Sequence, residues 1–295
     1  MFFSVLIPTY NYTCYKLVFD LQQQLQEAGI DYEIIVADDG SHDQVSVIAN
    51  LKINELPHCR YLRRTQNVGR SAIRNLLIAE SKGEWLLFLD SDARIDNPNL
   101  VKRYLEAIDH RGNNEILAGC LCHPDQCPSP LVTLRYLYEK EADKWRNADT
   151  CNKNPYQRFT VFNVLFHRPV FDICRFDEAF CEYGYEDTLL GFELQRAGIG
   201  LLYIDNPVTH IGLESNEVFL RKIKVSIVSL KRLRSKLNGQ TLLERTADRV
   251  SDWHLAWLYR LFFAVSHHHM ERNLLSSKPN LKIFALYKLG LYLQR

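Results

Sequence analysis

Short apolar runs and longer amphipathic segments alternate through the first hundred residues. Apolar runs of this length, bounded by Gly, Pro and polar residues, predict buried strands, whereas apolar residues recurring at helical spacing predict helices. The predicted strands are residues 3–7, 32–37, 59–63 and 85–89, and the predicted helices are residues 15–28, 45–56 and 69–81. This order predicts a mainly parallel sheet covered on both faces by helices.

The alternation continues to about residue 214, where the character of the chain changes. Helices are predicted near 99–109 and at 188–197, with strands near 116–120, 159–166 and 200–204. Basic or aromatic helices follow at 219–237, 253–265 and 283–293, interrupted by the histidines at 267–269 and by the segment 276–279. We therefore expect an α/β domain at residues 1–214 and an amphipathic helical region at residues 215–295.

Polar clusters follow three of the predicted strands. They are Pro8, Thr9, Tyr10 and Asn11 after the first strand, Asp38 and Asp39 after the second, and Asp90, Ser91 and Asp92 after the fourth. Each cluster alone is typical of a turn or a helix cap. Because the carboxyl ends of parallel strands meet at one edge of a sheet, the three together predict a ligand site there.

Asp90 and Asp92 are the most informative pair, since two carboxylates this close repel each other unless a cation or hydroxyl groups share them. Oxygen ligands suit Mg²⁺ or Mn²⁺, whereas Ser91 or Asp92 alone would also serve as a helix cap. His210 leaves a later predicted strand and is a candidate second ligand. The convergence of strand ends favours a cation at Asp92, with Asp90 directed at ribose or sugar hydroxyls.

Two arginines begin the helix predicted at residues 69–81. Asn67 and Gly69 precede it, and Arg70 and Arg74 lie four residues apart, on one face near its start. Guanidinium groups bind phosphate bidentately, so the pair predicts a diphosphate contact. The alternative is two solvated surface arginines.

Glu186 and Asp187 lie in the first turn of the helix predicted to end at Gly198. The helix dipole favours carboxylates in the first turn, so one interpretation of these two acids is purely structural. The functional interpretation is that one acid is a general base and the other orients the substrate.

Composition narrows the classes of function. The 36 Lys and Arg nearly balance the 35 Asp and Glu, so no global field recruits nucleic acid. No apolar run approaches the ~20 residues of a spanning helix, and no secretory signal is evident, so we expect a cytoplasmic protein with eight reduced cysteines. The spacing of Cys120, Cys122, His123 and Cys127 fits no standard zinc pattern.

In their residues and their order along the chain, these motifs resemble those of the inverting nucleotide-sugar glycosyltransferases of family 2, which have the GT-A fold. The resemblance runs from about residue 4 to residue 212 and rests on the segments 4–11, 33–41, 67–75 and 89–92, on Tyr185-Glu186-Asp187 and on His210. It implies a nucleotide-binding part at about residues 1–95 and an acceptor-binding part at about 96–214.

The resemblance also implies roles for individual residues. Nucleotide contacts are expected of Pro8, Thr9, Tyr10, Asn11, Asp38, Asp39, Asn67, Gly69, Arg70, Arg74, Asp90 and Ser91, metal binding of Asp92 and His210, catalysis of Asp187 and Glu186, and sugar contacts of Asn163 and Tyr185. The expected cofactor is Mn²⁺ or Mg²⁺, the donor a UDP- or dTDP-sugar, and the acceptor a saccharide or a lipid-linked sugar in polysaccharide or glycolipid synthesis.

The same chemistry can be argued from the residues. Displacing a nucleoside diphosphate from an anomeric carbon requires its charge to be neutralised, and the attacking hydroxyl must lose a proton. Asp187 is our candidate for the base, with Glu186 orienting the acceptor, although the two roles are interchangeable at this stage. A sugar-phosphate nucleotidyltransferase is disfavoured, because residues 8–12 lack the glycine-rich phosphate loop. The remaining alternative is a non-catalytic nucleotide-sugar-binding scaffold.

The C-terminal helices carry aromatic residues beside cations. Examples are Trp253, Trp257, Tyr259, Phe262 and Phe263 beside Arg260, and Leu281, Ile283, Phe284 and Leu291 beside Lys282, Lys288 and Arg295. This pattern predicts peripheral contact with the inner face of the cell membrane. The alternative is packing on the catalytic domain or on a second subunit of a homo-oligomer.

Overall fold

The computed structural model of the chain describes residues 1–179, 184–237, 239 and 241–294. Within them the chain forms two compact units. The first contains residues 1–123, 143–179 and 186–212, and the second contains residues 124–142, 184–185 and the described part of 213–295.

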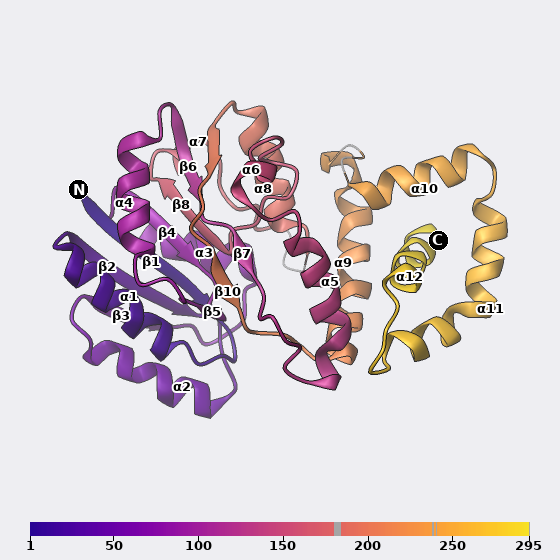
Figure 1. The fold of residues 1–295 in the computed structure, drawn as a ribbon, viewed down its shortest axis with the longest axis horizontal. Helices are drawn as coiled ribbons and strands as arrows, with labels where there is room; N and C mark the ends of the chain where they lie inside the picture. The colour runs from indigo at the N-terminus through magenta and orange to yellow at the C-terminus, as the bar shows by residue number, and fades with distance from the viewer. Residues whose placement is uncertain (180–183, 238, 240, 295) are drawn as a thin grey trace. The chain divides into compact units, whose positions relative to one another are not determined.

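The first unit is built on a seven-stranded sheet with the order β3-β2-β1-β4-β8-β6-β9. The strands are β1 (Phe2–Thr9), β2 (Asp31–Asp38), β3 (Cys59–Arg63), β4 (Trp85–Leu89), β6 (Asn114–Ala118), β8 (Asn163–His167) and β9 (Gly200–Tyr203). The four N-terminal strands are parallel, whereas β8 is antiparallel to both of its neighbours, β4 and β6. The sheet is therefore mixed and mainly parallel, as predicted (Figure 1).

Helices cover both faces of this sheet because its strands are apolar on both sides. Beside β1 and β4, one core contains side chains of α1 (Tyr15–Ala28) and α4 (Leu100–His110), and the other contains side chains of α3 (Arg70–Glu80) and α8 (Glu186–Arg196). Along β4, Leu87 and Leu89 point into the first core, whereas Leu86 and Phe88 point into the second. This alternation fixes the register, and hence which residues end each strand.

A second, three-stranded sheet is formed by short strands after the main ones. They are β5 (Ala93–Arg94), β7 (Leu121–Cys122) and β10 (Val208–His210), in the order β5-β10-β7. β10 pairs with β5 in antiparallel and with β7 in parallel. The remaining short elements of this unit are α2 (Gln44–Leu51), a 3₁₀ turn at Lys52–Glu55, α6 (Ala148–Cys151) and α7 (Val170–Ile173).

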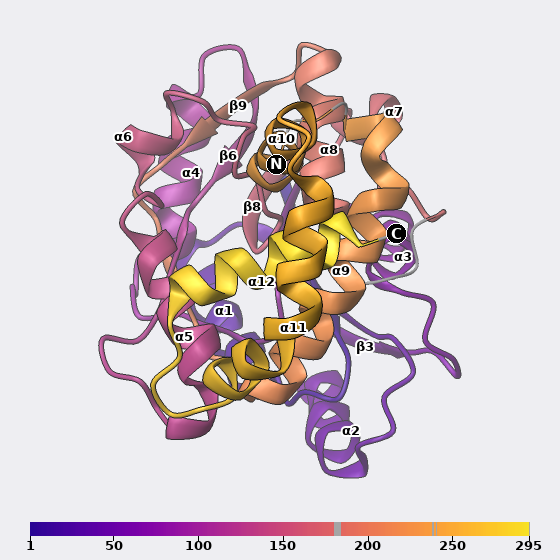
Figure 2. The same cartoon turned by 90° about the vertical axis from the view of Figure 1, so that its right-hand side faces the viewer.

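The second unit is helical. It contains a 3₁₀ turn at Pro130–Val132, α5 (Thr133–Asp143, of which Asp143 belongs to the first unit), α9 (Asn216–Leu237), α10 (Leu242–Asp252), α11 (Ala256–Leu274) and α12 (Leu281–Leu293). Figures 1 and 2 both show α12 lying among α9, α10 and α11. A Cβ atom on Gly290 would lie 2.0 Å from the Phe263 ring, so α11 and α12 approach closely there.

The helical region differs from the sequence prediction in three ways. α10 was not predicted, although Thr241 and Glu244 form a capping box at its start. The histidines at 267–269 were expected to interrupt a helix, but they lie within α11. The apolar face of α12 was a candidate membrane surface, but Phe284, Tyr287 and Leu293 are buried within the protein. No described helix is both long and apolar enough to span a bilayer.

The position of β4 generates a prediction about stability. Leu87 is fully buried between β1 and β8, so Leu87→Ala should lower the free energy of unfolding by about 2–5 kcal/mol. Urea denaturation followed by circular dichroism measures this change. Leu242→Ala removes the same atoms from an exposed position and should change stability by less than about 0.5 kcal/mol. Equal effects of the two substitutions would contradict the assignment of β4 to the core.

Candidate active site

Asp92 and His210 meet at the carboxyl end of the main sheet. Asp92 directly precedes β5 and His210 ends β10, and the antiparallel pairing of β5 with β10 places Ala93 opposite His210. The Ile211 amide also donates to the Asp92 carbonyl oxygen at 3.0 Å. As a result, Asp92 Oδ2 lies 3.0 Å from His210 Nε2. The structure thus brings together the two residues that the sequence analysis proposed as cation ligands.

The chain next to this pair has room for nothing larger than glycine. A Cβ atom on Gly212 would lie 2.2 Å from Asp92 Oδ2. Burial alone would raise the pKa of Asp92, but the hydrogen bond with His210 and the nearby charges lower it below its usual value. Asp92 is therefore held as a carboxylate, the form that a cation requires.

The geometry of the pair suits a divalent cation. Metal–oxygen and metal–nitrogen bonds of about 2.1 Å place two adjacent ligands of an octahedron about 3.0 Å apart, which is the separation found here. Among the described residues, no group of three or more His, Cys, Asp or Glu side chains surrounds a common point. Mg²⁺ is commonly bound by one or two protein side chains, with water and substrate phosphates as its remaining ligands, so two protein ligands are sufficient here.

Arg74 connects the strand end to the predicted catalytic helix. Its Nη2 lies 3.0 Å from Asp90 Oδ1, and its Nη1 lies 2.8 Å from Asp187 Oδ1. The Arg74 side chain is only 2 % exposed, and it lies over the Phe176 ring. Arg74 was expected to hold a diphosphate, but here it is buried between two carboxylates, so we assign it to positioning Asp90 and Asp187.

Glu186 and Asp187 open α8 inside a dense network. Besides Arg74, Asp187 accepts hydrogen bonds from Thr160 Oγ1 at 2.9 Å and from the Val161 amide at 3.0 Å. The Asp187 side chain retains 17 % exposure, and a carboxylate has about four acceptor positions. Glu186 is 7 % exposed and forms an ion pair with Arg70 at 3.1 Å. Both acids therefore make specific side-chain contacts in addition to their favourable position at the N-terminus of the helix.

The acids after β2 organise the neighbouring loops. Asp38 is fully buried, accepts a hydrogen bond from the Ser41 amide and is bonded by the Tyr61 hydroxyl. Asp39 accepts hydrogen bonds from the amides of Val68 and Gly69, which fixes the loop that leads into α3. Burial raises the pKa of Asp39 above its usual value despite these bonds.

The loop after β1 is tied to the loop after β2 by Asn11. The Asn11 side-chain oxygen accepts hydrogen bonds from the amides of His42 and Asp43, and the Asn11 amide donates to Ser41 Oγ. Thr9 is buried, and Tyr10 is exposed. Pro8 lies within β1, Ser91 lies between β4 and β5, and Asn67 lies between β3 and α3.

Two residues that were expected to contact sugar have other surroundings. The Asn163 side chain is buried, with its oxygen bonded to the Tyr104 hydroxyl and its nitrogen bonded to the carbonyl oxygens of Cys120 and Asn206. Its hydrogen-bonding groups are thus used inside the core, and we assign it a structural role. Tyr185 belongs to the second unit, where burial raises its pKa above the ordinary range.

Sequence reasoning missed two residues near the cation pair. His123 and Asp143 continue a line of hydrogen bonds from His210, and His123 was considered only as part of a cysteine cluster. The available signal was that His123 directly follows one short strand, β7, as His210 ends another, β10. Asp143 carried no signal, because its contact with His123 spans 20 residues.

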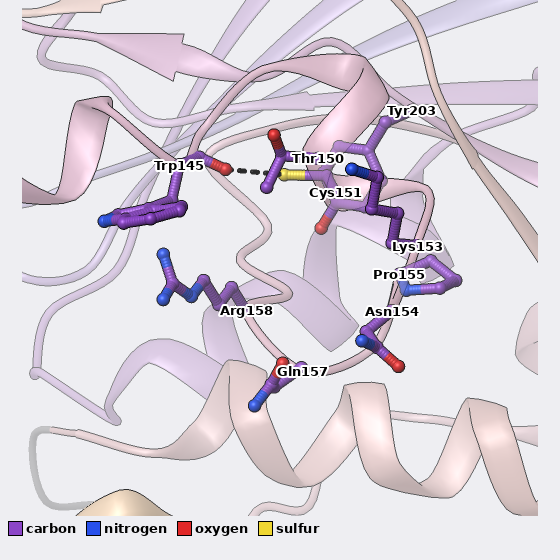
Figure 3. A pocket seen from close by; sticks show the side chains of 9 residues that line it. All are labelled: Trp145, Thr150, Cys151, Lys153, Asn154, Pro155, Gln157, Arg158 and Tyr203. Atoms are coloured by element: carbon purple, nitrogen blue, oxygen red, sulfur yellow. Dashed lines mark hydrogen bonds between the residues drawn. The ribbon is translucent and has the colours of Figure 1, made fainter.

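A concave pocket lies apart from these residues. Figure 3 shows its lining, which comprises Trp145, Thr150, Cys151, Lys153, Asn154, Pro155, Gln157, Arg158 and Tyr203. None of the predicted site residues contributes to it. The candidate site is therefore defined by the convergence of strand ends and not by this pocket.

The position of Arg74 generates a prediction. Arg74→Met leaves two largely buried carboxylates without their cation, so it should lower the free energy of unfolding by about 3–5 kcal/mol. Urea denaturation measures the loss. Arg94→Met removes an exposed ion pair with Asp96 and should cost at most about 1 kcal/mol. The arrangement would be refuted by an Arg74→Met protein as stable as the Arg94→Met control.

Comparison with known sequences identifies the family. The family model described as glycosyl transferase family 2 matches residues 4–171. The chain is 29 % identical over 227 residues to the chondroitin synthase of Escherichia coli, an alignment that covers 66 % of this chain and 32 % of that protein. The chain thus spans about a third of the length of this relative.

Comparison with solved structures supports the fold. Staphylococcus aureus TarS 1–349 in complex with UDP-GlcNAc is 20 % identical, with a TM-score of 0.51 over 78 % of this chain and 66 % of that one. The mannosyltransferase PcManGT of Pyrobaculum calidifontis in complex with GDP-Man and Mn²⁺ is 13 % identical, with a TM-score of 0.54 over 99 % and 88 %. These similarities confirm the predicted GT-A fold. Because the family model covers more than half of its length, the chain belongs to glycosyl transferase family 2.

Proposed function

We propose that this chain is a metal-dependent, inverting glycosyltransferase that transfers a sugar from a UDP-sugar to a hydroxyl of a saccharide or lipid-linked acceptor. The observation that carries the proposal is the Asp92–His210 pair, whose 3.0 Å separation suits a divalent cation at the carboxyl end of the sheet. Family membership and the nucleotide-sugar complexes of the structural neighbours support the same activity.

Asp92 and His210 would hold Mn²⁺ or Mg²⁺ against the donor diphosphate. When bound, the cation supplies positive charge that stabilises the departing nucleoside diphosphate. A neighbour that contains Mn²⁺ supports this assignment. Asp90, held by Arg74, would then accept hydrogen bonds from ribose or sugar hydroxyls.

Asp187 would take the proton from the acceptor hydroxyl. That oxygen forms a new bond to the anomeric carbon while the bond from this carbon to the diphosphate breaks on the opposite face, so one displacement inverts the centre. Arg74, Thr160 and the Val161 amide fix the carboxylate in one orientation. Glu186 orients the acceptor and remains the alternative base.

The UDP preference is supported by the TarS complex with UDP-GlcNAc, whereas the PcManGT complex contains GDP-Man. A donor screen with Mn²⁺ therefore needs UDP-sugars, dTDP-sugars and GDP-mannose. We expect nucleotide release above background with at least one UDP-sugar, and loss of that release with EDTA.

Substitution of the acids tests the mechanism. Asp187→Asn should lower transfer by about 10²–10⁴-fold, because the amide cannot accept the proton, while UDP binding measured by calorimetry stays near that of the unmodified chain. Asp20→Asn, which alters an acid bonded to Lys16, is the matched control and should retain activity. If transfer survives in both Asp187→Asn and Glu186→Gln, neither acid is the base.

The second unit is the proposed site of membrane contact. Residues 213–295 contain 15 Lys and Arg but only six Asp and Glu, a formal charge of +9 in a chain whose total is +1. α11 exposes a continuous apolar stripe at Trp257, Leu258, Leu261, Phe262 and Val265, and Trp253 is exposed just before this helix. Exposed aromatic and aliphatic side chains within a basic segment suit the surface of an anionic bilayer.

Vesicle flotation tests this contact. The full chain should float with phosphatidylglycerol-containing vesicles, and the double substitution Trp257→Ser and Phe262→Ser should weaken binding at least about tenfold, because both side chains would lose apolar burial. Trp145→Ser removes an exposed tryptophan from the first unit and should leave binding unchanged. A chain that never floats, or that dimerises through this stripe, would overturn the proposal.

A further inference from the structure

A line of four hydrogen-bonded side chains includes the Asp92–His210 pair. His210 Nδ1 lies 3.0 Å from His123 Nε2, and His123 Nδ1 lies 2.8 Å from Asp143 Oδ1. With Asp92 at the other end, the order is Asp92, His210, His123 and Asp143. All four belong to the first unit. We call this set the histidine relay.

The relay is held in place by the small sheet. His123 follows β7 and His210 ends β10, and β7 and β10 are parallel neighbours. The His123 side chain is 0 % exposed, and its backbone amide also donates to Asp143 Oδ2 at 3.1 Å. The Phe162 ring packs against the His210 ring with centroids 5.0 Å apart. Both imidazole rings are therefore fixed in position.

The direction of the hydrogen bonds follows from Asp143. A carboxylate only accepts hydrogen bonds, and Asp143 Oδ1 lies 2.8 Å from His123 Nδ1. His123 Nδ1 must therefore donate to Asp143. In a neutral imidazole the other nitrogen then accepts, so His123 Nε2 accepts from His210 Nδ1.

When His210 is neutral, this order leaves a lone pair on its Nε2, directed at the Asp92 carboxylate. Without metal, a proton between these two atoms, which lie 3.0 Å apart, makes the hydrogen bond to Asp92, and a divalent cation would take the place of that proton. The relay therefore selects the tautomer of His210 that binds metal.

We propose that His123 and Asp143 are positioning residues, which hold His210 in the Nδ1-protonated tautomer and thereby raise the affinity of the Asp92–His210 pair for a divalent cation. This inference rests on the proposed function of that pair. Outer partners of metal-bound histidines typically contribute about 10–100-fold to metal affinity.

The affinity test uses the full chain with UDP and Mn²⁺. Free Mn²⁺, measured by electron paramagnetic resonance, should give dissociation constants about 10–100-fold higher for His123→Phe and for Asp143→Ala than for the unmodified chain. His167→Gln replaces a histidine of β8 outside the relay and should leave the affinity unchanged. UDP binding without metal should be equal in all four proteins, which shows that each has folded.

A spectroscopic measurement separates positioning from a structural role. In ¹⁵N-labelled protein with Mg²⁺ and UDP, long-range ¹H–¹⁵N correlation should show His210 protonated at Nδ1, and Asp143→Ala should reduce the population of this tautomer. An unmodified chain that fails to bind Mn²⁺ with UDP would refute the cation site itself. The relay alone is refuted if His210→Ala abolishes binding while His123→Phe and Asp143→Ala bind Mn²⁺ normally, or if His210 is protonated at Nε2.

Discussion

The arrangement of the proposed site depends on one buried guanidinium. Arg74 bonds Asp90 at the end of β4 and Asp187 at the start of α8, so a single cation joins the donor side of the site to the catalytic side. Arg74 is 2 % exposed, so removing it would leave two largely buried carboxylates without their cation. The positions of Asp90 and Asp187 are thereby linked, and a shift of α3 would move both.

The cation pair is built on the small sheet. Asp92 directly precedes β5, whereas His210 ends β10 more than a hundred residues later, and the two side chains meet because β5 pairs with β10. β7 adds His123 behind His210, and Gly212 leaves the Asp92 carboxylate room. Three strands of two or three residues thus define the proposed metal ligands. The polar loops after β1 and β2 are tied to each other through Asn11, which gives the nucleotide side of the site a fixed backbone.

Much of the fold was predictable, because apolar runs and glycine- or proline-bounded turns are local signals. The four predicted N-terminal strands all formed as β1 to β4, and polar residues at the ends of β1, β2 and β4 pointed to the candidate site. The surroundings of individual side chains were harder to predict from the sequence. Arg74 looked like a phosphate ligand because sequence gives spacing but not burial, and Asn163 looked like a sugar contact although it bonds Tyr104, 59 residues away. The partnership of His123 with Asp143 depends on tertiary placement, for which neither residue carries a local pattern.

The most direct measurement of the central claim is a crystal structure of the full chain with UDP and Mn²⁺, with the metal located by anomalous scattering at the manganese edge. We predict one manganese ion bound to an Asp92 carboxylate oxygen, to His210 Nε2 and to the diphosphate of UDP, with Arg74 still between Asp90 and Asp187. Manganese bound elsewhere, or UDP bound away from the carboxyl ends of β1, β2 and β4, would contradict it.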